Sequence, residues 1–254
     1  MIGRIFSKDI GSCMKRIFAC DIDGTIYFDD TNLIELQHVI YELSKSWIIV
    51  FNTSRSLSDF QKLKLSLCQE GYAIVDSGKS IYKFLNCGRM KLDSIWEEYC
   101  SQYEFDELAI EADLLSLYYV SNIKVVFPWY IHIDLNRNLA KHEIEFLAER
   151  CKIKDYEFSY DGNGIGKALH RFISKKNALD FISKQSGNEL FLGVGNNLVD
   201  KPFVDLCRRR VMVTLNSNFY STDYIKIKPS GDSYKEIARI LENGGDYECP
   251  VSYR

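Results

Sequence analysis

Two carboxylates stand two residues apart near the start of the chain. Asp21 and Asp23 follow the apolar run Arg16–Cys20, and Gly24 and Thr25 come directly after them. A spacing of two places both side chains on the same side of a strand. Like charges this close raise one of the two pKa values unless a cation lies between them, so the pair indicates either a metal site or an acid/base pair. A single Asp-x-Asp-Gly is equally compatible with an acidic strand exit.

A hydroxyl-rich turn follows the next buried strand. The stretch IIVFNTSRS predicts a strand that ends near Thr53, with Ser54 and Arg55 opening a helix. Hydroxyl and backbone N–H groups at the start of a helix bind phosphate oxygens well. Taken alone, the same residues can simply cap the helix.

Two later stretches add a cation and a polar loop. Lys175 and Lys176 open an amphipathic helix, where a lysine can approach a developing negative charge. Asn196, Asn197 and Asp200 lie in a Gly-containing loop after the apolar strand FLGVG. Taken alone, the lysine pair is typical of a solvated helix face, and the Asn-rich stretch is typical of a turn.

The elements that must position these residues alternate along the chain. We predict strands at 16–23, 47–52, 72–75, 189–194 and 210–215, and helices at 32–45, 56–70, 175–184, 201–208 and 232–242. Gly71 is predicted to end the second helix. The alternation predicts an α/β fold with a doubly wound, mostly parallel, Rossmann-like core sheet. Because ligands bind at the carboxyl ends of such strands, the four stretches should converge on one crevice.

Residues 84–164 break this rhythm and predict a smaller inserted α/β domain. Helical patterns at 92–102, 104–117 and 138–151 flank the strand-like IKVVFPWYIHIDL, in which Pro128 marks a turn or an edge. We therefore expect a core domain of residues 1–83 and 165–254, and an inserted domain of residues 84–164.

The composition excludes several classes of protein. The 254 residues carry a net charge of −3, which gives no electrostatic case for binding nucleic acid or an anionic membrane. No apolar run approaches the roughly 20 residues that span a bilayer, and the N-terminal residues lack a secretory signal, so a cytoplasmic protein is expected. The eight cysteines show no zinc-ligand or disulfide spacing, and most should be reduced thiols. We expect a monomer or a weak homo-oligomer.

In this order, the four stretches resemble the haloacid dehalogenase-like superfamily of phosphatases. DIDGT resembles the first motif of that family, TSR the second, SKKNAL the third and GNNLVD the fourth. The resemblance covers the whole chain, because the insert is similar to the α/β cap of the branch with sucrose-phosphate, trehalose-phosphate and mannosylphosphoglycerate phosphatases. DSGKSIY is similar to the turn at the entrance of that cap.

The chemistry of phosphate ester hydrolysis suits these residues. It needs a nucleophile, a proton donor for the leaving oxygen, and positive charge around the phosphoryl group. Asp21 would attack phosphorus, Asp23 would act as general acid and base, Thr53 would bind a phosphoryl oxygen, and Lys175 would offset charge. The expected cofactor is Mg²⁺, held by Asp21, the Asp23 carbonyl, Asn196 and Asp200. Gly24, Thr25, Ser54, Arg55 and Asn197 are the expected substrate-binding residues.

One departure from the family affects the metal site. The family's fourth motif usually begins Gly-Asp, whereas the gap-free register places Asn196 at the metal-binding position. An amide oxygen still ligates Mg²⁺, but a neutral ligand attracts it less, so lower metal affinity is expected. The second motif has Ser54 where glycine is usual, which a helix start tolerates. An alternative register, with Val194 at the Asp position, loses both carboxylates of the motif.

The resemblance implies a Mg²⁺-dependent phosphatase that acts on a small phosphorylated metabolite, with a sugar phosphate as the expected substrate. A phosphosugar mutase of the same superfamily and a degenerate protein that only binds a phosphorylated ligand are the alternatives. In the cap, aromatic and polar groups suit sugar recognition. The expected cap contacts are Lys124, Trp129, His132, Arg137 and the loop 161–164.

Overall fold

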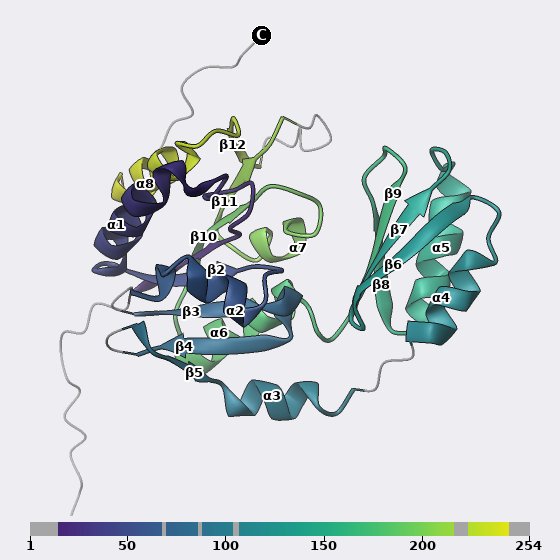
Figure 1. Ribbon diagram of the computed structural model, residues 1–254, viewed down its shortest axis with the longest axis horizontal. Helices are drawn as coiled ribbons and strands as arrows, with labels where there is room; N and C mark the ends of the chain where they lie inside the picture. The colour runs from purple at the N-terminus through teal and green to yellow at the C-terminus, as the bar shows by residue number, and fades with distance from the viewer. Residues whose placement is uncertain (1–14, 68–69, 86–87, 104–106, 216–222, 244–254) are drawn as a thin grey trace, which may run out of the picture.

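The computed structural model describes residues 15–67, 70–85, 88–103, 107–215 and 223–243, which form two separate β-sheets (Figure 1). The larger sheet has the strand order β12-β11-β10-β1-β2-β3-β4-β5. Its strands are β1 (Arg16–Cys20), β2 (Trp47–Asn52), β3 (Gly71–Val75), β4 (Ser80–Phe84), β5 (Met90–Leu92), β10 (Leu190–Gly195), β11 (Arg209–Val213) and β12 (Ile225–Ile227).

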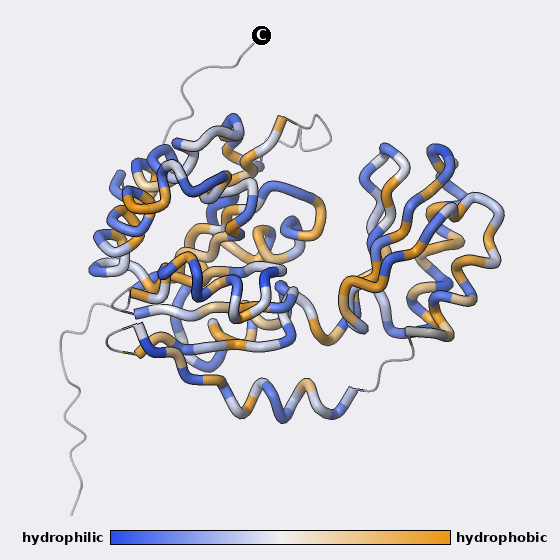
Figure 2. The backbone as a smooth tube through the Cα atoms, in the orientation of Figure 1, coloured by the Kyte–Doolittle hydropathy of each residue, from blue (hydrophilic) through white to orange (hydrophobic). Residues whose placement is uncertain are grey.

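The central strand β1 pairs in parallel with both β2 and β10, and its side chains alternate between two apolar layers. Phe18 and Cys20 face one layer, and Ile17 and Ala19 face the other. Figure 2 shows the hydrophobic segments gathered along these strands. Because β1 is buried on both faces, the residues just after it are fixed at the middle of the sheet edge.

Helices cover both faces of this sheet. The first layer contains α1 (Leu33–Ser44), α2 (Leu57–Lys62) and α8 (Ser233–Glu242). The second contains α3 (Ser94–Cys100), α6 (Lys175–Ser186) and α7 (Lys201–Val204). The predicted doubly wound, mostly parallel α/β sheet is therefore confirmed, with β4 and β5 as antiparallel additions at one edge.

Several predicted boundaries are wrong for local reasons. The predicted strand 16–23 ends at Cys20, so both acidic residues lie beyond it. The predicted helix 56–70 stops at Lys62, because Lys64 takes a positive φ of 51° before a short 3-10 turn, η2 (Leu65–Leu67). Gly71 does not end a helix but opens β3, where a Cβ would meet the Ile49 carbonyl at 2.4 Å. The predicted helix 201–208 is only the four residues of α7.

The insert folds as a four-stranded antiparallel sheet with helices on one face. Its order is β6 (Val120–Phe127), β7 (Tyr130–Leu135), β9 (Ile165–His170) and β8 (Tyr156–Tyr160). The helices α4 (Glu107–Leu115) and α5 (Lys141–Ile153) pack on the face turned away from the larger sheet (Figure 1). Pro128 lies in the tight turn between β6 and β7, as predicted.

The sheets cross the predicted domain limits at both ends of the insert. Strand β5 pairs with the larger sheet although it follows residue 84, and β9 pairs with the smaller sheet although it follows residue 164. The chain therefore leaves the larger sheet after Leu92, the end of β5, and leaves the smaller sheet after His170, the end of β9. The division of the chain into a core domain and an inserted cap domain stays a prediction. Among the described residues, no helix has the length and apolar composition needed to cross a bilayer.

Candidate active site

Asp21 is the first residue after the central strand and is held from three sides. Its N–H donates to the Val194 carbonyl of β10 at 2.9 Å, which continues the parallel pairing one residue past the strand. Its side chain accepts a hydrogen bond at Oδ1 from Lys175 Nζ at 2.7 Å and at Oδ2 from the Thr25 hydroxyl at 2.9 Å. Asp21 is only 5% exposed, so these donors fix the carboxylate at the sheet edge.

Lys175 joins Asp21 to a second buried carboxylate. Its ammonium donates to Asp21 Oδ1 and, at 2.8 Å, to Asp200 Oδ1. Asp200 is fully buried, and its Oδ2 accepts the N–H groups of Asn196 and Asn197 at 3.1 and 3.3 Å. Asp200 thus accepts three protein donors and is fully buried, whereas Asp21 accepts two and is slightly exposed. This difference favours a positioning role for Asp200 over direct metal ligation.

The cluster shifts the protonation of its members. Burial, followed by the charge of Asp200, raises the pKa of Asp21 to about 6, although Lys175 and Thr25 oppose the shift. Burial disfavours the charged form of Lys175, but the two carboxylates outweigh that penalty and raise its pKa above the usual value. The lysine therefore remains a cation throughout the neutral range.

Asp23 faces a different partner from Asp21. Its carboxylate, 52% exposed, accepts two hydrogen bonds from Arg55, at 2.8 Å from Nε and 2.6 Å from Nη2. The guanidinium also lies over the Tyr27 ring, 5.0 Å from its centroid. The predicted acid/base group is thus held at the exposed side of the site by a bidentate ion pair.

The end of β2 supplies hydroxyl groups beside this pair. Thr53 is buried, and its hydroxyl oxygen accepts the Arg55 N–H at 3.1 Å. Ser54 is exposed, and its hydroxyl accepts a hydrogen bond from Ser77 at 2.9 Å. The stretch TSR therefore lies at the same edge of the sheet as Asp23, as the strand order requires.

Asn196 lies against the first acidic stretch. Its Nδ2 donates to the Asp23 carbonyl at 2.7 Å, and a Cβ on Gly24, whose φ is +71°, would meet the same nitrogen at 2.4 Å. The Asn197 side chain is used within the loop, donating to Asn196 Oδ1 and accepting the Val199 N–H. Asn197 therefore stabilises the loop through its side chain, and its role in substrate binding stays a prediction.

The oxygen atoms around Asp21 and Asn196 include ligands of the kind that Mg²⁺ prefers. Among the described residues, no three His, Cys, Asp or Glu side chains gather into a metal cluster. The Asp21 carboxylate, the Asp23 carbonyl and the Asn196 amide form an oxygen-donor set once the amide makes a half-turn and presents Oδ1 instead of Nδ2. Mg²⁺ binds through one or two carboxylates and keeps several waters, so the residues present fit it.

The cap sheet closes over the loop after β10. A cavity of about 210 Å³ is lined from the cap by His132, Ser159, Asp161, Ile165 and Lys167, and from the core by Asn196, Asn197 and Leu198. A smaller cavity beside Lys175 includes Ser54 and Ser77. Trp129 of the cap donates its ring N–H to the Asp76 carbonyl of the core at 2.7 Å, which ties the two sheets together beside these cavities.

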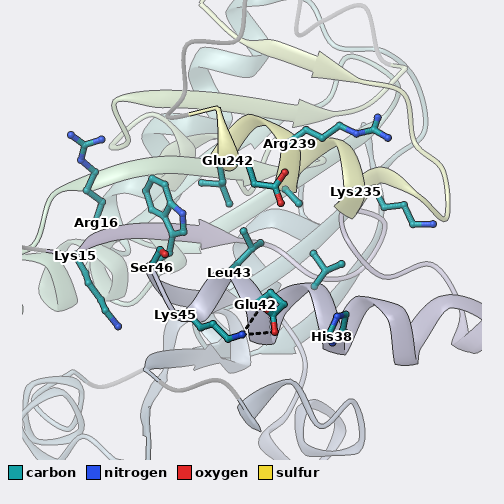
Figure 3. Close-up of a pocket in the computed structure, with 14 residues that line it drawn as sticks. Lys15, Arg16, His38, Glu42, Leu43, Lys45, Ser46, Lys235, Arg239 and Glu242 are labelled. Atoms are coloured by element: carbon teal, nitrogen blue, oxygen red, sulfur yellow. Dashed lines mark hydrogen bonds and ion pairs between the residues drawn. The ribbon is translucent and has the colours of Figure 1, made fainter.

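A much larger cavity, of about 1110 Å³, lies between α1 and α8 at the amino ends of β1 and β2 (Figure 3). Basic and acidic side chains share its lining with Trp47 and Leu43. None of the predicted site residues lines it. Because ligands of doubly wound sheets bind at the carboxyl ends of the strands, we place the site at the opposite edge.

Comparisons with known proteins identify the architecture. No family model matches the chain, and no curated protein matches it in sequence. Among solved structures, a haloacid dehalogenase-like hydrolase from B. subtilis matches with a TM-score of 0.56 and 15% identity, over 90% of this chain and 99% of that one. The chain has the haloacid dehalogenase-like fold.

Two other solved structures match the chain, each over at least 90% of its length. The sucrose-phosphatase of Synechocystis, solved with sucrose and phosphate, matches with a TM-score of 0.67 and 18% identity over 90% of this chain and 98% of its own. The C-terminal domain of the C. albicans trehalose-6-phosphate phosphatase matches with a TM-score of 0.57 and 15% identity, covering 91% and 92%. At these identities the likeness establishes the fold alone.

The structure also brings in residues that the sequence did not indicate. Asn52, the buried last residue of β2, donates to the Lys175 carbonyl at 3.0 Å and so fixes the start of α6. Lys167 lines the cap cavity, and the only sequence signal for it was the alternation of β9. Of the expected cap contacts, His132 and Asp161 line that cavity, whereas Arg137 pairs with Glu143 at 2.6 Å. Cys20 is buried with a raised thiol pKa, which suits a core residue.

Proposed function

We propose that this protein is a Mg²⁺-dependent phosphomonoester hydrolase that forms an aspartyl-phosphate on Asp21. The observation that carries the proposal is the buried Asp21 carboxylate, held by Lys175 and Thr25 at the carboxyl end of the central strand. A nucleophile needs this combination of fixed position and nearby positive charge. The fold adds support, because the compared structures include two sugar-phosphate phosphatases.

In the proposed reaction, an Asp21 oxygen attacks phosphorus and the bond from phosphorus to the leaving oxygen breaks. Asp23 gives its proton to that oxygen, and then takes a proton from the water that attacks the phosphoaspartate and releases phosphate. In the structure Arg55 donates to both Asp23 oxygens, so this carboxyl is already engaged before a substrate binds. We propose that the anionic substrate draws the guanidinium away and so frees Asp23 to carry a proton.

Lys175 and Thr53 complete the phosphoryl site in this proposal. Lys175 offsets charge on the phosphoryl oxygens, and the Thr53 hydroxyl donates to one of them. Asp200 positions Lys175 and the Asn196 loop through its two oxygens. Mg²⁺, when bound by Asp21, the Asp23 carbonyl and Asn196, would supply positive charge to the phosphoryl group.

The requirement for Mg²⁺ gives the first test of this function. We expect phosphate release from sugar monophosphates in the presence of Mg²⁺ and its loss with a chelator, measured as inorganic phosphate. Asn196→Asp should lower the Mg²⁺ concentration for half-maximal activity by about tenfold, because a carboxylate attracts the cation more strongly than an amide. A matched change at the neighbouring residue, Asn197→Asp, should have a smaller effect.

The outcomes separate the proposed function from its alternatives. Isomerised sugar phosphate in place of inorganic phosphate would favour a phosphosugar mutase. Asn196 also favours a second candidate, a protein that binds a phosphorylated ligand without turnover, because its amide now fills the place beside the Asp23 carbonyl. Ligand binding without phosphate release across the panel, in both wild type and Asn196→Asp, would select that candidate. The cytoplasmic location and the monomeric or weakly associated state stay predictions.

A further inference from the structure

One face of the cap sheet carries a row of polar side chains over the active site. The strand registers place Lys124 opposite His132, His132 opposite Lys167, and Lys167 opposite Ser159, across all four strands. The neighbouring residues Ile133 and Ala168 point the other way and pack into the apolar cluster with α4 and α5. The polar row therefore lies on the face turned toward the core (Figure 1).

Lys167 is the cation of this row inside the cavity. Its ammonium forms no ion pair within the part of the chain that the structure describes. Burial lowers the pKa of Lys167, while the nearby carboxylates, led by Asp200, act in the opposite direction. A partly desolvated ammonium without a carboxylate partner is costly unless a ligand supplies one.

The other polar groups of the cavity already have protein partners. The His132 ring contacts Asp134 at 2.9 Å. The Asp161 carboxylate accepts the N–H groups of Asn163 and Ile165 at 2.7 and 3.0 Å. An incoming ligand would therefore find Lys167 as the strongest available donor in the cavity.

The cavity is distinct from the smaller cavity beside Lys175. The two share no lining residue. A phosphoryl group bound beside Asp21 and Lys175 would thus leave the Lys167 cavity for the rest of the substrate.

We propose that this cavity binds the part of the substrate that is not transferred, and that Lys167 selects phosphomonoesters carrying a second anionic group, a carboxylate or another phosphate. The proposal rests on the proposed function, since it assigns the substrate class of the same site. His132 and Ser159 would contact the hydroxyl groups between the two anionic ends. The protein would then prefer acidic sugar phosphates to neutral ones.

Two matched esters test this preference. The compounds 6-phosphogluconate and sorbitol 6-phosphate differ only in a terminal carboxylate in place of a hydroxymethyl group. We expect wild type to show a kcat/KM at least about tenfold higher for 6-phosphogluconate, as a charged hydrogen bond implies. Lys167→Met should remove this preference mainly through KM, and should leave sorbitol 6-phosphate within about twofold of wild type.

A matched control comes from the same row. Lys124 lies on the edge strand β6, is exposed, and is not among the cavity-lining residues. Lys124→Met should keep the preference for 6-phosphogluconate. Equal kcat/KM for the two esters in wild type, or an unchanged ratio in Lys167→Met, would overturn the proposal.

A binding measurement separates this proposal from the proposed function. Calorimetric titration of Asp21→Asn with the two esters reports recognition without turnover. Asp21→Asn should bind 6-phosphogluconate more tightly than sorbitol 6-phosphate, and the double variant Asp21→Asn/Lys167→Met should bind the two esters equally. This result would support the Lys167 site even if no ester is hydrolysed. Hydrolysis of both esters with equal binding would instead overturn the Lys167 site and leave the phosphatase proposal standing.

Discussion

Asp21→Asn should reduce phosphate release by about a thousandfold or more, because the amide cannot attack phosphorus and no neighbouring group replaces it. The substitution is nearly isosteric, and the amide oxygen can still accept a hydrogen bond from Lys175. The loss should therefore fall on kcat, with substrate binding retained. Steady-state phosphate release at saturating Mg²⁺ measures it.

The control for this variant is its folding. Because Asp21 brings a second buried negative charge close to Asp200, its neutralisation should not lower stability, and urea unfolding should give a midpoint at or above that of wild type. A correctly folded Asp21→Asn that retains phosphate release within about tenfold of wild type would contradict the nucleophilic role.

Lys175→Met should affect both activity and stability. It leaves Asp21 and Asp200, which are 5% and 0% exposed, without the cation that joins them. Removing one partner from a buried ion pair costs about 3–5 kcal/mol, and we expect a loss of unfolding free energy in this range. Phosphate release should fall together with it, because no ammonium remains beside the phosphoryl site. Urea unfolding and activity at a temperature where the variant is folded measure the two effects.

Two further variants show whether the effect belongs to this cluster. Lys176→Met changes the exposed neighbour on the same helix and should alter stability by less than about 0.5 kcal/mol. Adding Asp200→Asn to Lys175→Met removes one stranded charge and should restore part of the stability without restoring activity. A Lys175→Met protein as stable as Lys176→Met would contradict the buried charge network.

The elements that position the site could be predicted because their signals are local. The apolar runs of β1, β2 and β10 are continuous, as expected for strands buried on both faces, and each leads directly into polar residues. Parallel strands in a doubly wound sheet meet at one edge, so Asp21, Thr53 and the loop at Asn196 were expected together. The structure places them at that edge.

The pairing of charged side chains could not be predicted in the same way. Asp23 was expected to point to the same side as Asp21. However, β1 ends at Cys20, Asp23 forms an isolated β-bridge with Tyr27, and its carboxylate pairs with Arg55. Asp200 was expected as a metal ligand, whereas its oxygens meet Lys175 and two N–H groups. Such choices depend on contacts between residues distant in sequence, which the spacing of motifs does not contain.

The cap was the least predictable part of the site. Lys167 lies in IGKALH, which has the alternation of a strand but no motif, and only the register with β7 places it beside His132 over the core. Positive φ angles at Asp76 and Ser77 turn the chain into the antiparallel β4, which the sequence did not indicate. Non-glycine residues rarely adopt this conformation, so sequence patterns seldom reveal it.

Chemical trapping of the phosphorylated enzyme tests the central claim most directly. Borohydride reduces an aspartyl-phosphate to homoserine, and peptide mass spectrometry then locates the modified residue. During turnover of a sugar phosphate with Mg²⁺, we predict homoserine at position 21 and at no other acidic position, with none formed in the absence of substrate. Steady phosphate release with an unmodified Asp21 peptide, or homoserine at Asp23 or Asp200 instead, would contradict the account.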